Sequence, residues 1–294
     1  MSAPERVVER MAEWYRKADQ LYKEVVTEVR KVFRKSRLTL PFDEINARKM
    51  GTIATKIYTV LYKLNKRKYC DLCDYLWEEA WLEAVGIIPG LEDVLLFDSP
   101  REQKDYHSGI DRAVKWFRAK YDVDISKEYP AINREVVLSE EPESSRSEWR
   151  AERRPGKTGK PPKFNAEKFV EKQLRTAQPN TGYVYDNEVE RKRDRFFESV
   201  LSHAEEGSRR GVDEDYTRAE NLWNRQTEQG FIDTEDALRK EAYKTSGVQL
   251  VRWDTERDER VCEECQAMDG LIFPIDRVPS KPHPRCRCRV TPVR

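Results

Sequence analysis

The chain has 294 residues, enough for two ordinary domains or for one domain with long helical extensions. Charged residues make up 37% and the mean hydropathy is −0.89, which favours exposed helices and modest cores over a large buried sheet. Basic and acidic residues nearly balance at a net charge of +1, so only local clusters can indicate a nucleic-acid partner. No apolar run reaches the roughly 18 residues that cross a bilayer, and the N-terminus lacks a signal-peptide pattern. We therefore expect a soluble protein without a membrane partner, made in a cytosol.

From Glu5 to about Arg34 apolar residues recur every three or four positions, which predicts one long amphipathic helix. The apolar stripe consists of Val8, Met11, Trp14, Ala18, Leu21, Val25, Val29 and Val32. Its spacing is close to a heptad seam, and it is longer than a chain this hydrophilic needs for its own core. We expect the stripe to pack against another protein. An intramolecular hairpin with the next helix is the alternative.

Two more helices are predicted in the first half of the chain. One runs from about Asp43 to Val85 and a shorter one covers roughly Arg101 to Ala119, because apolar residues again mark one side of each. Cys70 and Cys73 lie in the middle of the first of these helices, on one face and with no second half-site. We interpret them as core thiols. A redox pair, or a metal half-site completed by another subunit, is the alternative.

The composition changes between Ser139 and Lys163, which is polar, rich in Pro and Gly, and basic in its second half. Such a composition is typical of a flexible linker or arm. The basic residues proposed as contacts are Arg150, Arg153, Arg154 and Lys157. The segment is either a solvated linker or an arm that contacts DNA or an acidic protein face.

Helices return from Asn165 to Thr245, with a break around Gly207 to Gly211 and a further break expected at Gly230. After them, Val248–Trp253 is rich in β-forming residues and predicts a strand, for which Arg287–Val293 is the candidate partner.

The expected fold class is thus α+β, mostly α: long N-terminal helices, a linker, a second helical region and a small C-terminal module that contains strands. The expected limits are 1–138 for an N-terminal helical domain, 139–163 for the linker and 164–294 for a second domain, with helices in 164–246 and the module in 247–294.

A cluster of cysteines and one histidine carries the chemistry of this module. Cys262-Glu-Glu-Cys265 is followed, seventeen residues later, by His283-Pro-Arg-Cys286-Arg-Cys288. A Cys-x-x-Cys pair presents two sulfurs to one metal, and a second group from a distance completes a tetrahedron. We expect Zn²⁺ to be bound by Cys262, Cys265 and His283, with Cys286 or Cys288 as the fourth ligand.

The expected zinc is structural. A catalytic zinc keeps an open position and a nearby acid or base, whereas five protein groups, mostly sulfur, crowd this one. His107 and His203 lie far off in predicted helices, so the paired bases of a metal nuclease are missing. A region this small is not stable on its apolar surface alone. The metal is expected to pin a miniature core of Trp253, Val261, Met268, Leu271, Ile272 and Phe273.

The same segment resembles the phage head-morphogenesis family, also called the Mu F-like minor head proteins. The resemblance rests on Gly247-Val-Gln-Leu-Val-Arg-Trp253, Asp258-Glu-Arg-Val-Cys262-Glu-Glu-Cys265, Met268-Asp-Gly270 and Pro282-His283-Pro-Arg-Cys286-Arg-Cys288. It covers roughly the last fifty-five residues, and no family motif is apparent before residue 165. The family's cysteines and histidine correspond to Cys262, Cys265, His283, Cys286 and Cys288.

The resemblance implies a minor structural protein, present in few copies at or near the portal vertex of a tailed virus, acting in head assembly or genome delivery. It implies no enzymatic activity and no small-molecule substrate. The implied partners are the portal and other head proteins, with non-specific contact to packaged DNA. The implied location is the virion, and the host cytoplasm during assembly.

A zinc-ribbon protein that binds nucleic acid is the alternative. In its favour, the stretch from Lys281 to Arg294 contains Arg285, Arg287 and Arg289 and no acidic residue, so it forms a basic rim on the zinc module. Against it, acidic residues flank the first cysteine pair and would repel phosphate.

Overall fold

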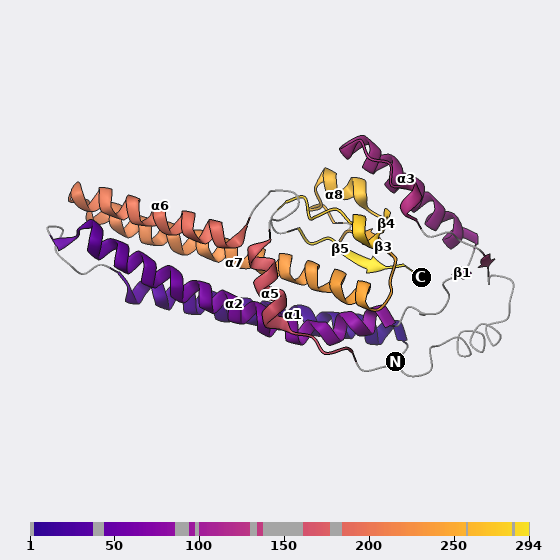
Figure 1. Cartoon of the computed structure of the whole chain (residues 1–294), viewed down its shortest axis with the longest axis horizontal. Helices are drawn as coiled ribbons and strands as arrows, with labels where there is room; N and C mark the ends of the chain where they lie inside the picture. Colours follow the sequence, from indigo (N-terminus) through magenta and orange to yellow (C-terminus); the bar gives the residue numbers. More distant parts are fainter. Residues whose placement is uncertain are drawn as a thin grey trace. The chain divides into compact units, whose positions relative to one another are not determined.

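The computed structural model describes residues 3–37, 44–85, 94–97, 100–129, 134–137, 161–176, 184–256, 258–283 and 286–293 (Figure 1). Within these ranges the helices are α1 (Ala3–Lys35), α2 (Ala47–Val85), α3 (Pro100–Tyr121), α5 (Ala166–Arg175), α6 (Tyr185–Glu205), α7 (Arg209–Thr245) and α8 (Glu263–Met268). The strands are β1 (Val94–Phe97), β2 (Arg134–Val137), β3 (Leu250–Asp254), β4 (Ile272–Pro274) and β5 (Arg289–Pro292). The expectation of a mostly helical chain with a small sheet at its C-terminal end is confirmed.

The chain forms two compact units, each built from two separate segments. One, the helical unit, combines Met1–Leu76 with Asn165–Glu235, and the other, the sheet unit, combines Trp77–Phe164 with Asp236–Arg294. The boundary between the units falls inside α2 and α7. The domains expected from the sequence are segments that would each fold independently, which is a different property from compactness. Their limits therefore stay a prediction.

In the helical unit, the second half of α1 packs inside the chain. Leu21, Val25 and Val29 are almost fully buried, and Phe33 meets the ring of Phe196 edge to face at 6.2 Å. The expectation that the stripe docks onto another protein is therefore wrong for this half of α1, because these side chains already have partners. The intramolecular alternative holds here. The side chains of Val8, Met11 and Trp14 lie outside the described residues.

Gly230 does not interrupt the helix, contrary to the sequence-based expectation, since α7 continues through it. A Cβ built at Gly230 would lie 2.0 Å from the Tyr69 hydroxyl oxygen, and Tyr69 is fully buried. The glycine thus allows α7 to approach α2 closely, and the surrounding helix hydrogen bonds offset the low helix propensity of one residue.

The turn between α6 and α7 is held by a buried carboxylate. Asp215, 3% exposed, accepts a hydrogen bond of 2.7 Å from the Ser199 hydroxyl on one oxygen and lies 2.7 Å from Nδ1 of His203 through the other. Arg218 also reaches Asp215, at 3.6 Å. Gly207 supplies the positive φ of 70° that the turn needs. His203 is thus a packing histidine that ties the end of α6 to α7.

This contact predicts a pH-dependent stability of the helical unit. The hydrogen bond to Asp215 raises the pKa of His203, and nearby Glu206 adds to the shift while Arg218 opposes it. The charged imidazole therefore contributes stability that is fully present below its unfolded pKa of about 6.5 and is lost as pH rises through the raised folded pKa. In urea unfolding between pH 5.5 and 8.5, the advantage of the wild type over His203→Gln should shrink as pH rises. A constant difference across that range would contradict the assignment.

The sheet unit contains two small sheets. β3 is the central strand of the antiparallel order β4-β3-β5, with Val251 opposite Phe273 on one side and Pro292 on the other. β1 and β2 pair in parallel. The strand expected at Val248–Trp253 and its C-terminal partner are confirmed, whereas β4 and the β1–β2 pair were not predicted. None of the helices in the described ranges is both long and apolar enough to cross a membrane.

Candidate metal centre

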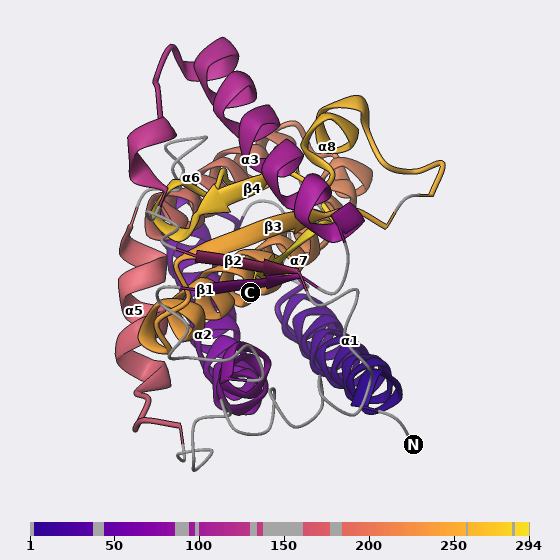
Figure 2. The same cartoon turned by 90° about the vertical axis from the view of Figure 1, so that its right-hand side faces the viewer.

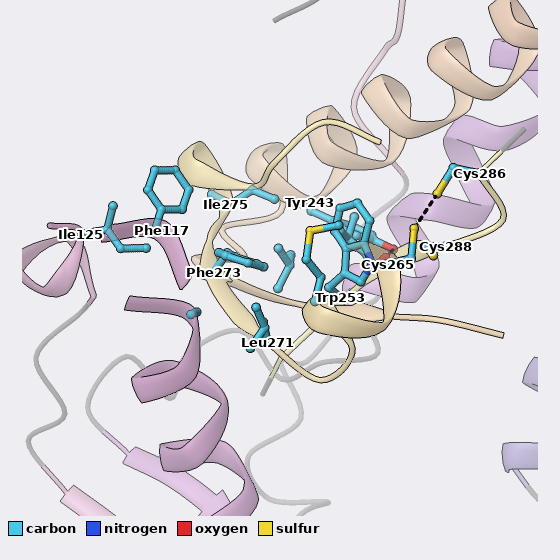
Figure 3. Packing of buried hydrophobic residues seen from close by; sticks show 14 of the residues in the cluster. Phe117, Ile125, Tyr243, Trp253, Cys265, Leu271, Phe273, Ile275, Cys286 and Cys288 are labelled. Atoms are coloured by element: carbon cyan, nitrogen blue, oxygen red, sulfur yellow. Dashed lines mark hydrogen bonds between the residues drawn. The ribbon is translucent and has the colours of Figure 1, made fainter. Parts of the chain in front are cut away.

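The cysteine cluster lies at one end of the sheet unit's hydrophobic core. Cys265, Cys286 and Cys288 are buried, 4% exposed or less, and belong to the same cluster as Trp253, Leu271 and Phe273. Figure 3 shows the cysteines beyond Trp253 and, at the opposite end of the core, Phe117 and Ile125. The residues expected to form a miniature core do so, with Val261 packed partly buried against them and Ile272 in an adjoining cluster.

Short-range hydrogen bonds fix α8 beside β3. The Trp253 amide donates to the Leu271 carbonyl and the Gly270 amide to the Trp253 carbonyl, both at 2.8 Å. Gly270 has a φ of 71°, a conformation that glycine adopts without strain. The Thr255 amide donates to the Asp269 carboxylate at 3.0 Å. These bonds hold the chain that leaves β3 and the chain that leaves α8 together, which places the first cysteine pair.

The first pair is positioned by the start of α8. Cys262 is the N-cap residue, and its sulfur accepts a hydrogen bond of 3.4 Å from the Cys265 amide. The helix begins directly after Cys262, so both sulfurs of the Cys-x-x-Cys pair lie at its first turn. With two residues between them at the start of a helix, the two cysteines present their sulfurs side by side as metal donors.

The second group comes from the segment that leads into β5. Cys265 Sγ lies 3.5 Å from His283 Nε2 and 3.7 Å from Cys286 Sγ. The donor atoms of Cys262, Cys265 and His283 all lie within 4.8 Å of one another, and so do those of Cys265, Cys286 and Cys288. The structure thus brings all five expected residues together, with Cys265 common to both groups.

The thiols differ in acidity. The pKa of Cys262 is lowered, mainly by the hydrogen bond from the Cys265 amide. The pKa of Cys286 is lowered to about 6, mainly by a hydrogen bond from the Cys288 thiol, and the same bond raises the pKa of Cys288. Burial raises the pKa of Cys265 to about 12. Cys286 therefore favours the thiolate, the form that binds metals.

The basic residues expected at the rim of the module have other contacts. The guanidinium of Arg287 donates two hydrogen bonds, of 2.8 and 2.6 Å, to the carboxylate of Asp258, and this pairing holds the pKa of Asp258 at about 2. Arg289 lies in β5. Arg285 is outside the described residues, and so are Arg150, Arg153, Arg154 and Lys157 of the expected arm. Of these basic residues the structure therefore describes only Arg287 and Arg289, and a shared basic surface stays a prediction.

Sequence analysis missed the support that α3 gives to the module (Figure 2). A Cβ at Gly109 would lie 2.8 Å from the Gly270 carbonyl oxygen, so α3 packs directly on the turn after α8. Arg112 donates to the Asp269 carbonyl, and the Tyr129 hydroxyl donates to the Ile272 carbonyl at 2.7 Å. No local sequence signal links these residues to a segment more than a hundred positions away. Only the glycine in the middle of a predicted helix hinted at a close approach.

Comparison with known protein families gives one match at residues 191–291, to a family described as phage Mu protein F like protein. The matched segment begins inside α6 and spans the whole of α7, α8 and the central strand β3, together with all five candidate ligands. Comparison with curated proteins and with solved structures gives no match. The match over residues 191–291 confirms that the C-terminal part of the chain resembles this family of phage head-morphogenesis proteins.

Proposed function

We propose that this chain is a minor structural protein of a tailed-virus head, placed at or near the portal vertex, where it acts in head assembly or genome delivery. The observation that carries the proposal is the family match over residues 191–291. The family is one of structural head proteins, which agrees with a chain that uses its most distinctive residues to stabilise a fold.

We further propose that the cysteine cluster holds one structural Zn²⁺. In a tetrahedral site with Zn–S of about 2.3 Å and Zn–N of about 2.0 Å, two sulfurs lie about 3.8 Å apart and a sulfur and a nitrogen about 3.5 Å apart. The 3.7 Å from Cys265 Sγ to Cys286 Sγ and the 3.5 Å from Cys265 Sγ to His283 Nε2 fit those edges. We accordingly propose Cys262, Cys265 and His283 as ligands, with Cys286 or Cys288 as the fourth.

The same donor set argues for a closed site rather than a catalytic one. Sulfur dominates it, Cys265 and Cys286 are buried, and Cys288 lies beside them as a fifth group that excludes water. When bound, the zinc would hold the first turn of α8 and the approach to β5 together, which is a folding role.

The zinc-ribbon reading, in which the module binds nucleic acid through its rim, has less support. Arg287 is paired with Asp258 on both donors, so it offers little free charge to a phosphate. The described part of the module has no recognition helix exposed for a groove, since α8 is six residues long and buries Cys265 and Met268.

Co-expression with the portal protein of the same genome tests the virion role. The chain should copurify with the portal and not with the major capsid protein used as a control bait, and it should be present in purified particles in few copies. Trp14→Glu, at a stripe position the sequence marks as apolar, should weaken that copurification if the first half of α1 docks. Absence of the chain from particles would refute the proposal.

A further inference from the structure

The exposed face of α2 carries an unusual run of positive charge. Between Ile45 and Cys70 the sequence contains no aspartate or glutamate. The basic residues in this stretch are Arg48, Lys49, Lys56, Lys63, Lys66, Arg67 and Lys68. In a chain whose net charge is only +1, so long a stretch of one sign on a single helix is a local exception.

Three of these cations are neutralised by neighbouring acids, and four are not. Lys49 pairs with Glu44 at 3.2 Å, Lys66 with Glu171 at 2.6 Å and Lys68 with Glu24 at 2.7 Å. The remaining four are exposed and form no ion pair within the part of the chain that the structure describes. They are Arg48, Lys56, Lys63 and Arg67.

These four cations share one face of the helix. At about 100° per residue they fall within roughly a third of the helix circumference, and they extend over about 28 Å at 1.5 Å per residue. The buried residues Ile57, Leu61 and Asn65 point to the opposite side. The exposed Thr59 lies among the cations, and its hydroxyl can donate a hydrogen bond to phosphate.

Helix α1 adds to the same positive region. The pKa of Glu28 is lowered first by its hydrogen bond with Lys31, and also by the charges of Lys31, Lys35 and Arg67. One carboxylate, itself 2.6 Å from Lys31, is thus surrounded by cations from two helices. The excess charge near Arg67 remains positive.

We propose that this face of α2, with Lys35 of α1, binds the phosphate backbone of duplex DNA without reading its sequence. A row of cations and hydroxyls contacts phosphates but carries no base-specific pattern. Single-stranded nucleic acid would call for exposed aromatic rings on which bases stack, and Tyr58, the aromatic residue nearest the middle of the row, is buried. A bilayer would call for an apolar face, whereas Val60 is the one large apolar side chain strongly exposed there.

The choice of duplex DNA as the polyanion rests on the proposed role in a virus head. The binding experiment, however, is independent of the portal copurification that tests that role. Binding of the full chain to a fluorescent 30-base-pair duplex of mixed sequence is measured by anisotropy between about 50 and 200 mM NaCl. The test variant is Lys56→Gln/Lys63→Gln/Arg67→Gln. The matched control is Lys23→Gln/Arg193→Gln/Arg210→Gln, whose cations pair with Asp19, Asp194 and Glu214 at 2.6, 2.8 and 2.8 Å.

The test variant should bind at least about tenfold more weakly at low salt, and its log–log salt slope should be shallower by up to about 2.7, because three phosphate contacts are lost. The control should stay within about twofold, since its cations are already compensated. Both variants should unfold thermally like the wild type, and portal copurification should not change.

Three outcomes would overturn the inference. Equal affinities and salt slopes for the wild type and the test variant would show that the face does not contact DNA. Tighter binding to a 30-nucleotide single strand would assign the surface to another ligand. Equal competition by poly-glutamate at matched charge would indicate an acidic protein face. Loss of portal copurification, with DNA binding intact, would count against the proposed function and not against this surface.

Discussion

Replacing Cys265 with serine is expected to abolish stoichiometric zinc binding and to unfold the sheet unit. Cys265 is 1% exposed and is the residue common to both groups of three candidate ligands, so its replacement removes a donor from each group. Structural zinc contributes on the order of 10 kcal/mol of apparent folding free energy in small modules. A loss of that size is comparable with the whole free energy of unfolding of a typical domain, about 5–15 kcal/mol.

Elemental analysis should therefore find close to one zinc per chain in the wild type and none in the variant. Trp253 is buried in the wild type, so unfolding of the variant should shift its fluorescence to the red. Cys70→Ser is the matched control, because Cys70 lies in α2 outside both groups of candidate ligands. It should keep the metal and the fold. A zinc-free wild type with a fully folded C-terminal segment would exclude a structural metal.

The second large effect is expected at Gly230. Glycine-to-alanine changes inside helices usually stabilise by about 0.5–1 kcal/mol. At Gly230 the new methyl would lie 2.0 Å from the Tyr69 hydroxyl oxygen and 2.5 Å from Cζ. Tyr69 is fully buried and cannot swing into solvent. Gly230→Ala should therefore destabilise the helical unit by about 1–3 kcal/mol, the usual cost of overpacking.

Gly51→Ala provides the comparison, since Gly51 also lies inside a helix but its nearest neighbour would be Phe197 at 3.8 Å, an ordinary contact. Urea unfolding should show opposite signs for the two substitutions. If both stabilise, α7 and α2 are farther apart at this level than the structure indicates, and Gly230 has no packing role.

The elements that sequence analysis predicted well are those with strong local signals. The 3.6-residue periodicity of α1 and the β-forming run around Trp253 determine their own secondary structure, and the spacing of Cys262 and Cys265 determines their adjacency at the start of α8. These features depend on a few neighbouring residues, so they can be predicted from the sequence. The five candidate ligands were found in the same way.

What sequence analysis could not predict are contacts between distant segments. An apolar stripe has the same sequence pattern whether it packs within the chain or against a partner protein. The burial of Leu21 inside the chain therefore could not be predicted from the pattern. The packing of Gly109 on the turn at Gly270 and of Gly230 on Tyr69 depends likewise on tertiary proximity. The basic face of α2 was overlooked because its cations are spaced four to eight residues apart in the sequence and form one surface only on a helix.

The pairing of early and late segments in both units affects how the chain folds during synthesis. The residues that complete the helical unit, 165–235, are made long after Met1–Leu76, and the sheet unit needs Asp236–Arg294 as well. At about 5–20 residues per second, the ribosome leaves the apolar sides of α1 and α2 without their partners for roughly ten seconds or more. A nascent chain in that state exposes Val25, Ile57 and Leu61, all buried later. Pairing between nascent chains would bury these apolar sides wrongly in that interval. Binding by a chaperone in the same interval would protect them until residues 165–235 are made.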